Sequence, residues 1–419
     1  MNNFKQIAKT ICVNAKSATK IMAKLDVKTK NKILSDAILL IKSKKNDILL
    51  ANKKDIEFAQ KNHLDSAKID RLLIDETKID SMIKSIEDII NLPDPVGKIS
   101  LDVYRPSGLN IKRISTPIGV LLAIYEARPN VSVDISSMAI KSGNVAILRS
   151  GIEAFNSSKI LVEIFQTALE SNGINKFAIN FCDNIDRKLI SQLLKFDKFI
   201  DVVVPRGGKS LIQAISKNTK IPLFKHLDGN CHTYIHQDAN FEKARKILIN
   251  AKMRRVGICG ATESLLVDKK IARQIIPLIM DDMQNLGCEV RGDKLSVKID
   301  NRIILAKKSD YYCEYLDKVL SLKIVKNVDE AIEHISKFGS SHTESIVTED
   351  KKSAQKFLQE IDSAIVMHNS STQFADGGEF GFGGEVGIAT GKLHARGPVG
   401  LEQLTIFKYI VEADFAIRK

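Results

Sequence analysis

A cysteine in a glycine-bordered loop is the residue whose surroundings best suit covalent chemistry. Cys259 lies between Gly257 and Gly260, directly after a basic segment. Small neighbours let a substrate approach a thiol, and nearby cations increase the reactive thiolate fraction of a cysteine. The cations of this segment are Lys252, Arg254 and Arg255. Since most free cysteines pack like small hydrophobic side chains, the alternative that Cys259 is structural stays open at this point.

Two turns could contact phosphate groups. Arg149-Ser-Gly151 and Pro205-Arg-Gly-Gly-Lys209 each follow an apolar strand-like run and combine small residues with a cation. Backbone N–H groups at the start of a helix bind anions in such turns. The sequence contains neither G-x-G-x-x-G after a strand nor a Walker A motif, so each turn could equally be an ordinary connection.

The histidines do not form a convincing metal site in the sequence. His226, His232 and His236 have no cluster of carboxylates or cysteines at metal-ligand spacing beside them, and we expect no metal. Cys231 and His232 are adjacent, so on a strand their side chains point to opposite faces and cannot form a nucleophile–base pair. The glycine-rich segment 376–387 fits a flexible linker as well as a backbone that approaches a ligand.

Length and composition predict a globular protein with several domains. The 419 residues are enough for two or three domains, with 44% hydrophobic and 27% charged residues. We find neither the apolar segment of a secretory signal nor an apolar run that could span a bilayer, and therefore expect a cytoplasmic protein with no membrane partner. The six cysteines show no paired spacing, which is typical of reduced thiols.

The formal net charge of +13 raises nucleic acid as a partner. However, acids are interspersed among the lysines, aromatic residues make up only 6%, and tryptophan is absent, so few side chains could stack on bases. We therefore expect a solvated basic surface and no nucleic-acid partner. Such a surface favours an anionic small substrate or a phosphorylated cofactor.

Apolar periodicity divides the chain into a helical start, two alternating regions and an extended end. Apolar steps of three and four predict helices in residues 1–90, and the extended stretches of 99–114 around Pro106-Ser-Gly108 predict a hairpin. Continuous apolar strands between helices then predict parallel sheets covered on both faces. The expected strands are 120–125, 145–148, 177–181, 202–204, 264–267, 345–347 and 405–411, and the expected helices are 131–142, 153–171, 187–195, 208–216, 240–254, 270–286, 331–337 and 350–360.

Several longer segments together resemble the gamma-glutamyl phosphate reductases of the aldehyde dehydrogenase superfamily. The run Lys392–Glu402 is the most specific of them; the others are 124–131, 204–208, 225–232, the Cys259 loop and 342–350. The resemblance implies an aldehyde-dehydrogenase-like α/β fold with two open parallel-sheet domains and a small β extension for homo-oligomerisation. The implied parts are an NADPH-binding domain of 1–100 and 118–228, a catalytic domain of 229–392, and an extension of 101–117 and 393–419.

The resemblance also assigns catalytic roles. Cys259 falls on the nucleophile of the family, and Asn130 falls where a side-chain amide holds the developing oxyanion together with the backbone N–H of the cysteine. Candidates for gripping the substrate are the basic residues Arg128, Lys392 and Arg396.

Cofactor-binding positions follow in the same way. Arg149 falls where a cation meets the adenosine ribose, which favours NADPH over NADH. Gly207 and Gly208 fall on the pyrophosphate side, and Glu314 falls near the carboxylate that holds the nicotinamide ribose.

The implied reaction is NADPH-dependent reduction of L-glutamate 5-phosphate to L-glutamate 5-semialdehyde through a cysteine thioester, in proline biosynthesis and with a functional link to a glutamate 5-kinase. Hydrolytic relatives carry a deacylating glutamate in Glu-Leu-Gly-Gly, where this chain has His226-Leu-Asp-Gly229; the difference favours reduction, because hydrolysis would discard the acyl group. Val256 and Gly260 stand where the family usually has Pro and Asn. The alternatives are an aldehyde dehydrogenase of another substrate and a nucleic-acid-binding protein on an inactive enzyme fold.

Overall fold

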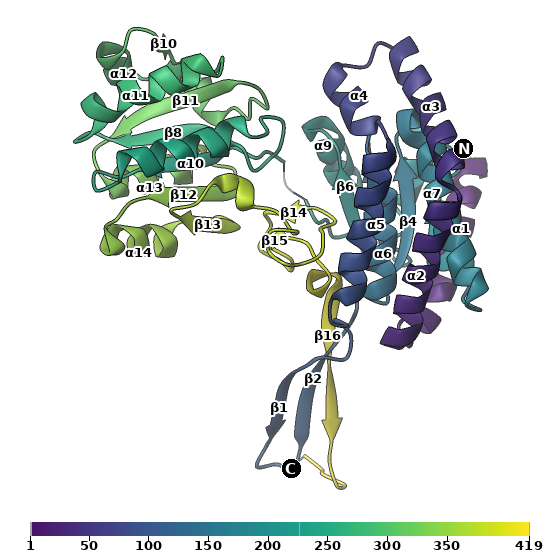
Figure 1. Ribbon diagram of the computed structural model, residues 1–419. Coiled ribbons are helices and arrows are strands. Elements are labelled where there is room, and N and C mark those ends of the chain that lie inside the picture. The colour runs from purple at the N-terminus through teal and green to yellow at the C-terminus, as the bar shows by residue number, and fades with distance from the viewer. Residues whose placement is uncertain (1, 226, 419) are drawn as a thin grey trace. The chain divides into compact units, whose positions relative to one another are not determined.

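The structure, a computed structural model, describes residues 2–225 and 227–418 and divides them into two compact units (Figure 1). The first unit holds the described residues of 1–225, 381–387 and 399–419, and the second those of 226–380 and 388–398. We predicted that 381–387 belong to the catalytic part, whereas their contacts group them with the first unit. The functional roles given to the parts stay predictions.

A four-stranded parallel sheet forms the centre of the first unit, in the order β5-β4-β3-β6. Its strands are β3 (Val120–Tyr125), β4 (Val145–Ser150), β5 (Ile179–Phe181) and β6 (Val202–Arg206). Every residue of β3 and β4 is buried, which explains why these strands are nearly continuous apolar runs and do not alternate. Because β3 pairs in parallel with both β4 and β6, the carboxyl ends of the three strands lie at one edge.

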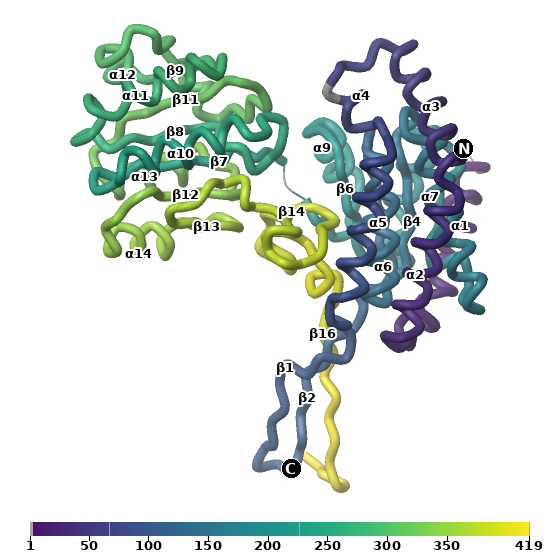
Figure 2. Tube along the Cα trace, in the orientation of Figure 1, coloured from purple at the N-terminus to yellow at the C-terminus, as the bar shows by residue number. Residues whose placement is uncertain are grey.

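Helices cover this sheet (Figure 2). They are α1 (Asn2–Met22), α2 (Val27–Ser43), α3 (Lys45–Lys61), α4 (Ser66–Leu72), α5 (Glu76–Asn91), α6 (Asn130–Lys141), α7 (Phe155–Ser171), α8 (Arg187–Leu193) and α9 (Lys209–Asn218), with short 3-10 helices η1 (Ile152–Ala154), η2 (Lys176–Ala178) and η5 (Glu402–Leu404). α6 and α7 pack against each other, α2 packs against both, and α1 contacts β4 and α8. The predicted helical start is confirmed.

A small antiparallel sheet, in the order β1-β2-β16, also belongs to the first unit (Figure 1). β1 (Ile99–Tyr104) and β2 (Asn110–Pro117) form the expected hairpin, and Gly108 takes a positive φ of 82° in its turn. β16 (Thr405–Glu412) pairs with β2 along its whole length. Two segments from opposite ends of the sequence therefore form one sheet, as expected.

The second unit is built on a seven-stranded parallel sheet in the order β10-β9-β11-β8-β7-β12-β13. Its strands are β7 (Cys231–Ile235), β8 (Thr262–Asp268), β9 (Glu289–Gly292), β10 (Ile304–Leu305), β11 (Val319–Val325), β12 (Thr343–Val347) and β13 (Ile365–His368). Its helices are α10 (Phe241–Met253), α11 (Ala272–Asn285), α12 (Lys294–Ile299), α13 (Val328–Phe338), α14 (Lys351–Glu360), η3 (Lys308–Tyr312) and η4 (Thr372–Phe374). A two-stranded antiparallel pair, β14 (Ile388–Ala389) and β15 (Gly397–Pro398), completes it.

The two open parallel sheets and the small antiparallel sheet confirm the predicted fold class. No helix in the described part of the chain combines the length and apolar composition needed to cross a membrane.

A buried carboxylate joins α3 to the start of α7. Asp55 is fully buried and accepts hydrogen bonds from the backbone N–H groups of Asn156 (3.1 Å) and Ser157 (2.8 Å) and from both of their side chains. The residue before α7, Ala154, has no capping side chain, so Asp55 satisfies two of the N–H groups that a helix leaves unpaired at its start.

Replacing this carboxylate should destabilise the first unit. In Asp55→Ala the buried donors of Asn156 and Ser157 lose their acceptor, and we expect a loss of about 3 kcal/mol in the free energy of unfolding, measured by urea denaturation. The control is Glu57→Ala on the exposed face of the same helix, which should change it by less than ~0.5 kcal/mol. Equal effects of the two substitutions would contradict a capping role for Asp55.

Candidate active site

Cys259 lies in the loop between α10 and β8, and its side chain is half-buried. The turn before β7 packs directly on its backbone. A Cβ placed on Gly229 would lie 2.6 Å from the Cys259 Cα and 2.8 Å from its carbonyl carbon, so only glycine fits there. This close approach holds the thiol-bearing peptide against the turn that precedes β7.

Cys231, the first residue of β7, fixes the same peptide through its sulfur. Its Sγ lies 3.1 Å from the Cys259 carbonyl oxygen and 3.5 Å from Nδ1 of His342. Burial raises the pKa of the Cys231 thiol well above its usual value, so it stays protonated and donates to that oxygen. His232 points elsewhere, to Glu344 (2.9 Å), which confirms that Cys231 and His232 do not pair.

Gln373 of η4 supports the loop from another side. Its side-chain amide donates to the carbonyl oxygens of Ala251 (2.9 Å), at the end of α10, and Arg255 (3.3 Å), in the loop. Its oxygen accepts from Arg254 (3.4 Å). Because Gln373 is only 5% exposed, these bonds satisfy carbonyl groups that the end of the helix would otherwise leave unpaired. No pattern in the sequence indicates this residue.

The same element also explains the glycine that follows the thiol. A Cβ on Gly260 would lie 3.2 Å from the Thr372 carbonyl oxygen, so a larger residue there requires η4 to shift slightly. The hydroxyl of Thr372 in turn lies 3.0 Å from that of Thr262, at the start of β8. Gly260, which stands where the family usually has Asn, thus leaves room for η4 to pack closely.

Lys252 does not supply free positive charge to the thiol, which corrects our prediction. Its ammonium is fully buried and paired with the buried carboxylate of Glu263. Burial raises the pKa of Glu263 to about 7, although the adjacent ammonium of Lys252 opposes the shift. The cations of this segment that remain exposed are Arg254 and Arg255.

The buried ion pair also contacts the segment that carries Glu314. The second oxygen of Glu263 accepts a hydrogen bond from the backbone N–H of Leu316 (3.1 Å). Glu314 is half-buried in the loop between η3 and β11. Within the second unit, Glu263 therefore links the strand after Cys259 to the loop that bears Glu314.

Asn130 belongs to the first unit and is the first residue of α6, with an exposed side chain. Its Nδ2 donates to Oδ2 of Asp134 (3.0 Å), one helical turn later. Arg128 lies in the turn that leads from β3 to this helix. Both residues thus stand on the carboxyl side of β3, at the sheet edge where ligands of open α/β sheets bind.

Arg149 lies at the same edge. We had predicted it in a turn after the strand, whereas the structure places it within β4. Its Nη2 donates to the carbonyl oxygen of Ile185 (2.7 Å), and it is only 8% exposed. In the described part of the chain its Nε has no hydrogen-bond partner. A cation with unused donor capacity at a strand end fits the anionic part of a nucleotide.

Gly207 and Gly208 follow β6, between that strand and α9. The Glu126 carboxylate accepts a hydrogen bond from the Gly208 N–H (3.3 Å), and a Cβ on Gly207 would lie 2.6 Å from the same carboxylate. The turn therefore presents backbone N–H to an anionic group, as predicted for a phosphate contact. Glu126 is exposed, so its side chain can leave the turn.

Lys392 and Arg396 both contact Asp362 in the second unit. The Lys392 ammonium pairs with that carboxylate, and Arg396 donates to its Oδ1 (2.8 Å) and to the Asp362 carbonyl oxygen (2.7 Å). A substrate carboxylate would have to compete with Asp362 for both side chains. Their substrate-binding role stays a prediction.

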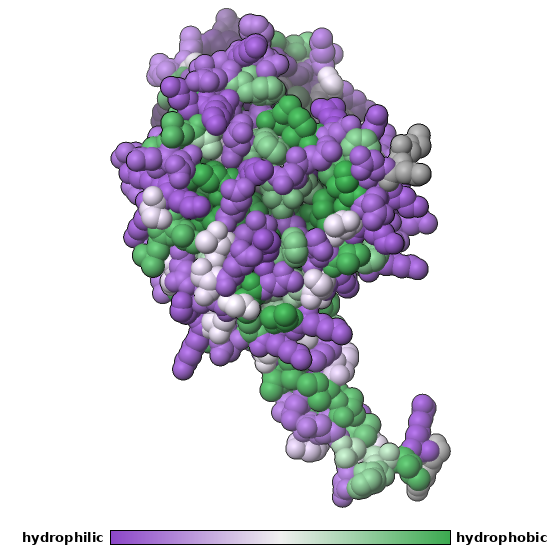
Figure 3. All heavy atoms as spheres, turned by 90° about the vertical axis from the view of Figure 1, so that its right-hand side faces the viewer, coloured by the Kyte–Doolittle hydropathy of each residue, from purple (hydrophilic) through white to green (hydrophobic). Residues whose placement is uncertain are grey.

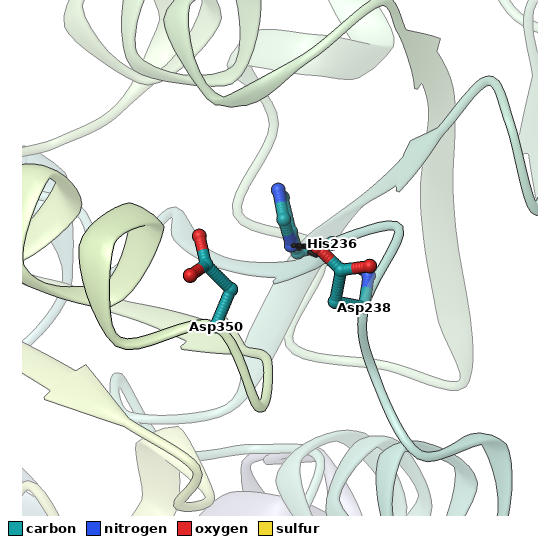
Figure 4. Close-up of side chains that lie close together, drawn as sticks. All are labelled: His236, Asp238 and Asp350. Carbon is teal, nitrogen blue, oxygen red and sulfur yellow. Dashed lines mark hydrogen bonds and ion pairs between the residues drawn. The ribbon is translucent and has the colours of Figure 1, made fainter.

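One histidine does have carboxylates near it in space. His236, Asp238 and Asp350 bring one ligand atom each to within 4.8 Å of one another (Figure 4). Asp350 already caps α14 through Lys352 N (3.3 Å) and Ser353 N (2.9 Å), and His236 Nδ1 lies 2.9 Å from Thr348 Oγ1. The cap of α14 explains the position of Asp350, and the hydrogen bond to Thr348 explains that of His236. His226 lies outside the described residues.

The site residues thus fall into two groups, one in each unit. The first unit brings Asn130, Arg128, Arg149, Gly207 and Gly208 to the carboxyl edge of one sheet, and the second holds Cys259, Glu314, Lys392 and Arg396. A parallel α/β sheet that gathers polar residues at its carboxyl edge is typical of the class of nucleotide-binding enzymes. The half-buried cysteine of the second unit is a candidate nucleophile.

Comparison with known proteins agrees with this class. The model of the aldehyde dehydrogenase family matches residues 3–297 and 313–410, and the chain belongs to that family. It is 48% identical to a gamma-glutamyl phosphate reductase of Rhodospirillum rubrum, covering 95% of this chain and 93% of the relative, and 45% identical to one of Erythrobacter litoralis, covering 97% and 96%. Within the family, the chain belongs with the gamma-glutamyl phosphate reductases.

Solved structures show the same relationship. The crystal structure of gamma-glutamyl phosphate reductase from Thermotoga maritima has a TM-score of 0.96 at 40% identity and covers 98% of this chain and 100% of that one. An acetylating aldehyde dehydrogenase from Geobacillus thermoglucosidasius, at 18% identity and a TM-score of 0.70, covers 99% and 98% and shares the fold.

Substitution of Gln373 should loosen the Cys259 loop. Gln373→Glu removes both N–H donors and places a carboxylate against two carbonyl oxygens, so we expect a loss of about 2–4 kcal/mol in the free energy of unfolding and an altered rate of Cys259 alkylation. Urea denaturation and mass-resolved alkylation measure the two effects. Gln274→Glu makes the same change at an exposed position of α11 and should leave both within error. If Gln373→Glu changed neither the free energy of unfolding nor the rate of Cys259 alkylation, Gln373 would not support the loop.

Proposed function

We propose that the protein reduces L-glutamate 5-phosphate to L-glutamate 5-semialdehyde with NADPH and releases phosphate, as a step of proline biosynthesis. Membership of the gamma-glutamyl phosphate reductases supports this reaction. The observation that carries it is the half-buried Cys259, whose backbone is held by Gly229, Cys231 and η4. Such a thiol is positioned to attack an acyl group.

In the proposed reaction Cys259 is the nucleophile. Its sulfur bonds to the acyl carbon, the carbon–oxygen bond to phosphate breaks, and a thioester forms. Asn130 and the Cys259 backbone N–H stabilise the intermediate oxyanion, an effect of about 3–4 kcal/mol for each donor. After hydride addition the carbon–sulfur bond breaks, which releases the aldehyde and restores the thiolate. Phosphate is a good leaving group, so no strong general acid is needed.

A nicotinamide cofactor supplies the hydride when bound. In the proposal, Arg149 would hold a 2′-phosphate, which favours NADPH. The Gly207–Gly208 turn would hold the pyrophosphate, and Glu314 would hold the nicotinamide ribose. The buried Lys252–Glu263 pair keeps the Glu314 loop in place through Leu316.

Neither alternative function, an aldehyde dehydrogenase of another substrate or a nucleic-acid-binding protein, is favoured. The full-length similarity is to reductases, and residues 226–229 lack the deacylating glutamate of hydrolytic aldehyde dehydrogenases. A nucleic-acid-binding role on an inactive fold gains no support, because the residues expected for catalysis are present in both units.

The small antiparallel sheet is suited to self-association in this proposal. β1 and β16 form its two edges, and hydrophobic side chains lie along it (Figure 3). Tyr104 is 80% exposed and Tyr409 56% exposed. Strand edges of this kind pair readily with another chain, and we expect a second copy to cover them in a homo-oligomer.

The reverse reaction tests the assignment. With semialdehyde, phosphate and NADP⁺, the protein should form NADPH, and omission of phosphate should abolish the signal. Cys259→Ser should lower the rate by roughly 10⁴-fold or more, because no thioester can form. Cys313→Ser, at another half-buried cysteine of the same unit, should keep the rate within ~3-fold. Phosphate-independent aldehyde oxidation would exclude the reductase.

Coenzyme preference tests Arg149. Arg149→Gln should lower the preference for NADPH over NADH by about 10- to 100-fold, the equivalent of ~1.5–3 kcal/mol for a charged hydrogen bond, with little change in kcat at saturation. KM values for both coenzymes measure this. Arg187→Gln removes an exposed cation that acts on Arg149 only through its charge and should change the preference by less than ~3-fold. A preference unaffected by Arg149→Gln would remove this residue from the cofactor site.

A further inference from the structure

The amide of Asn130 has a fixed partner one turn along its own helix. Its Nδ2 donates to Oδ2 of Asp134 at 3.0 Å, and the Asn130 side chain is exposed while Asp134 is half-buried. The amide torsion of asparagine has broad preferences, so an unrestrained side chain would sample several orientations. A carboxylate accepts hydrogen bonds only, and it therefore selects the orientation that presents nitrogen to it.

Groups from three other elements of the first unit surround Asp134. Ser85 of α5 donates to its other oxygen, Oδ1, at 3.4 Å. Arg206, at the end of β6, attracts its charge, and Glu385 of the 381–387 segment repels it. Arg206 and Glu385 lie 3.7 Å apart as an ion pair. The carboxylate is thus surrounded by groups from α5, β6 and the glycine-rich segment.

The charge state of Asp134 suits a hydrogen-bond acceptor for the Asn130 amide. Removal from water raises its pKa to about 6, and Arg206 and the hydrogen bonds from Asn130 and Ser85 oppose that shift. Near pH 7.5 the group is therefore an ionised acceptor. The glycine-rich segment also lies close to Arg206, since a Cβ on Gly387 would lie 3.2 Å from its Nη1.

We propose that Asp134 is a positioning residue for catalysis: its carboxylate anchors one N–H of the Asn130 amide and so leaves the other N–H available to the oxyanion of the reacting acyl group. The inference rests on the proposed function, because it assigns the oxyanion contact to Asn130. A donor held in place before the reaction stabilises developing charge without a cost of reorientation. Asp134 itself does not touch the substrate.

A double-mutant cycle in the reverse assay tests this, with Asn130→Ala, Asp134→Asn and the double variant. Asn130→Ala should lower kcat by about 10²–10³-fold, the effect of removing one such donor. Asp134→Asn should lower kcat by roughly 10-fold with the KM for NADP⁺ nearly unchanged. Because Asp134 acts through Asn130, the double variant should match Asn130→Ala within ~2-fold, whereas independent sites would multiply their effects.

Ser85→Ala is the matched control. It removes the hydrogen bond to the other oxygen of Asp134 and leaves the bond to Asn130, so kcat should stay within ~2-fold. Urea denaturation of every variant separates loss of folding from loss of rate. Asp134→Ala, which keeps no acceptor for the Asn130 amide, is measured beside Asp134→Asn, whose amide oxygen can still accept a hydrogen bond. It takes the place of Asp134→Asn in the cycle if that variant does not fold.

Three results would overturn the inference while the proposed function stands: wild-type rates for both Asp134→Asn and Asp134→Ala, a wild-type rate for Asn130→Ala, or a double variant about 10-fold slower than Asn130→Ala. Failure of the proposed function is distinct, because the wild-type protein would then form no NADPH in a phosphate-dependent manner. That outcome would remove the basis of the inference as well.

Discussion

The close packing around the Cys259 peptide is the constraint on which the proposed chemistry depends. Gly229 leaves no space for a side chain against it, Cys231 donates to its carbonyl oxygen, and Gln373 caps the helix that precedes it. A loop bearing a nucleophile is useful only if its sulfur and its backbone N–H keep a fixed relationship, since both act on one carbonyl group. Dense packing supplies that rigidity where the loop itself has glycines.

Charge at the site is arranged differently from the simplest expectation. A basic segment before a cysteine suggests a field that activates the thiol, but the lysine of that segment is buried with Glu263. Removing one member of a buried pair leaves an uncompensated charge, so the pair acts mainly on structure. It holds the ends of the Cys259 loop and, through Leu316, the loop of Glu314.

The sequence predicted elements wherever local pattern decides them. The strand at 120–125 and most helices were found within a few residues, because buried parallel strands and amphipathic helices have strong signatures. β9, β10, β11 and β13 were missed. β9, β10 and β13 have at most four residues, which is too short for a clear periodicity. Cys259 and the turns that contain Arg149, Gly207 and Gly208 were singled out from their neighbours, and the other site residues came from the resemblance. Asp55, Glu263 and Gln373 could not be found, because their partners lie on other elements and no spacing records such contacts.

The pairing of β2 with β16 has a consequence for synthesis of the chain. Lys112 and Glu412, joined across these strands, are separated by 300 positions, and the 381–387 segment also packs back on the first unit. A ribosome-bound chain therefore exposes one edge of β2 until β16 has been made, although the surrounding helices have long been made. During that interval an unpaired strand edge is open to other nascent chains, which makes timely docking of β16 a requirement for productive assembly.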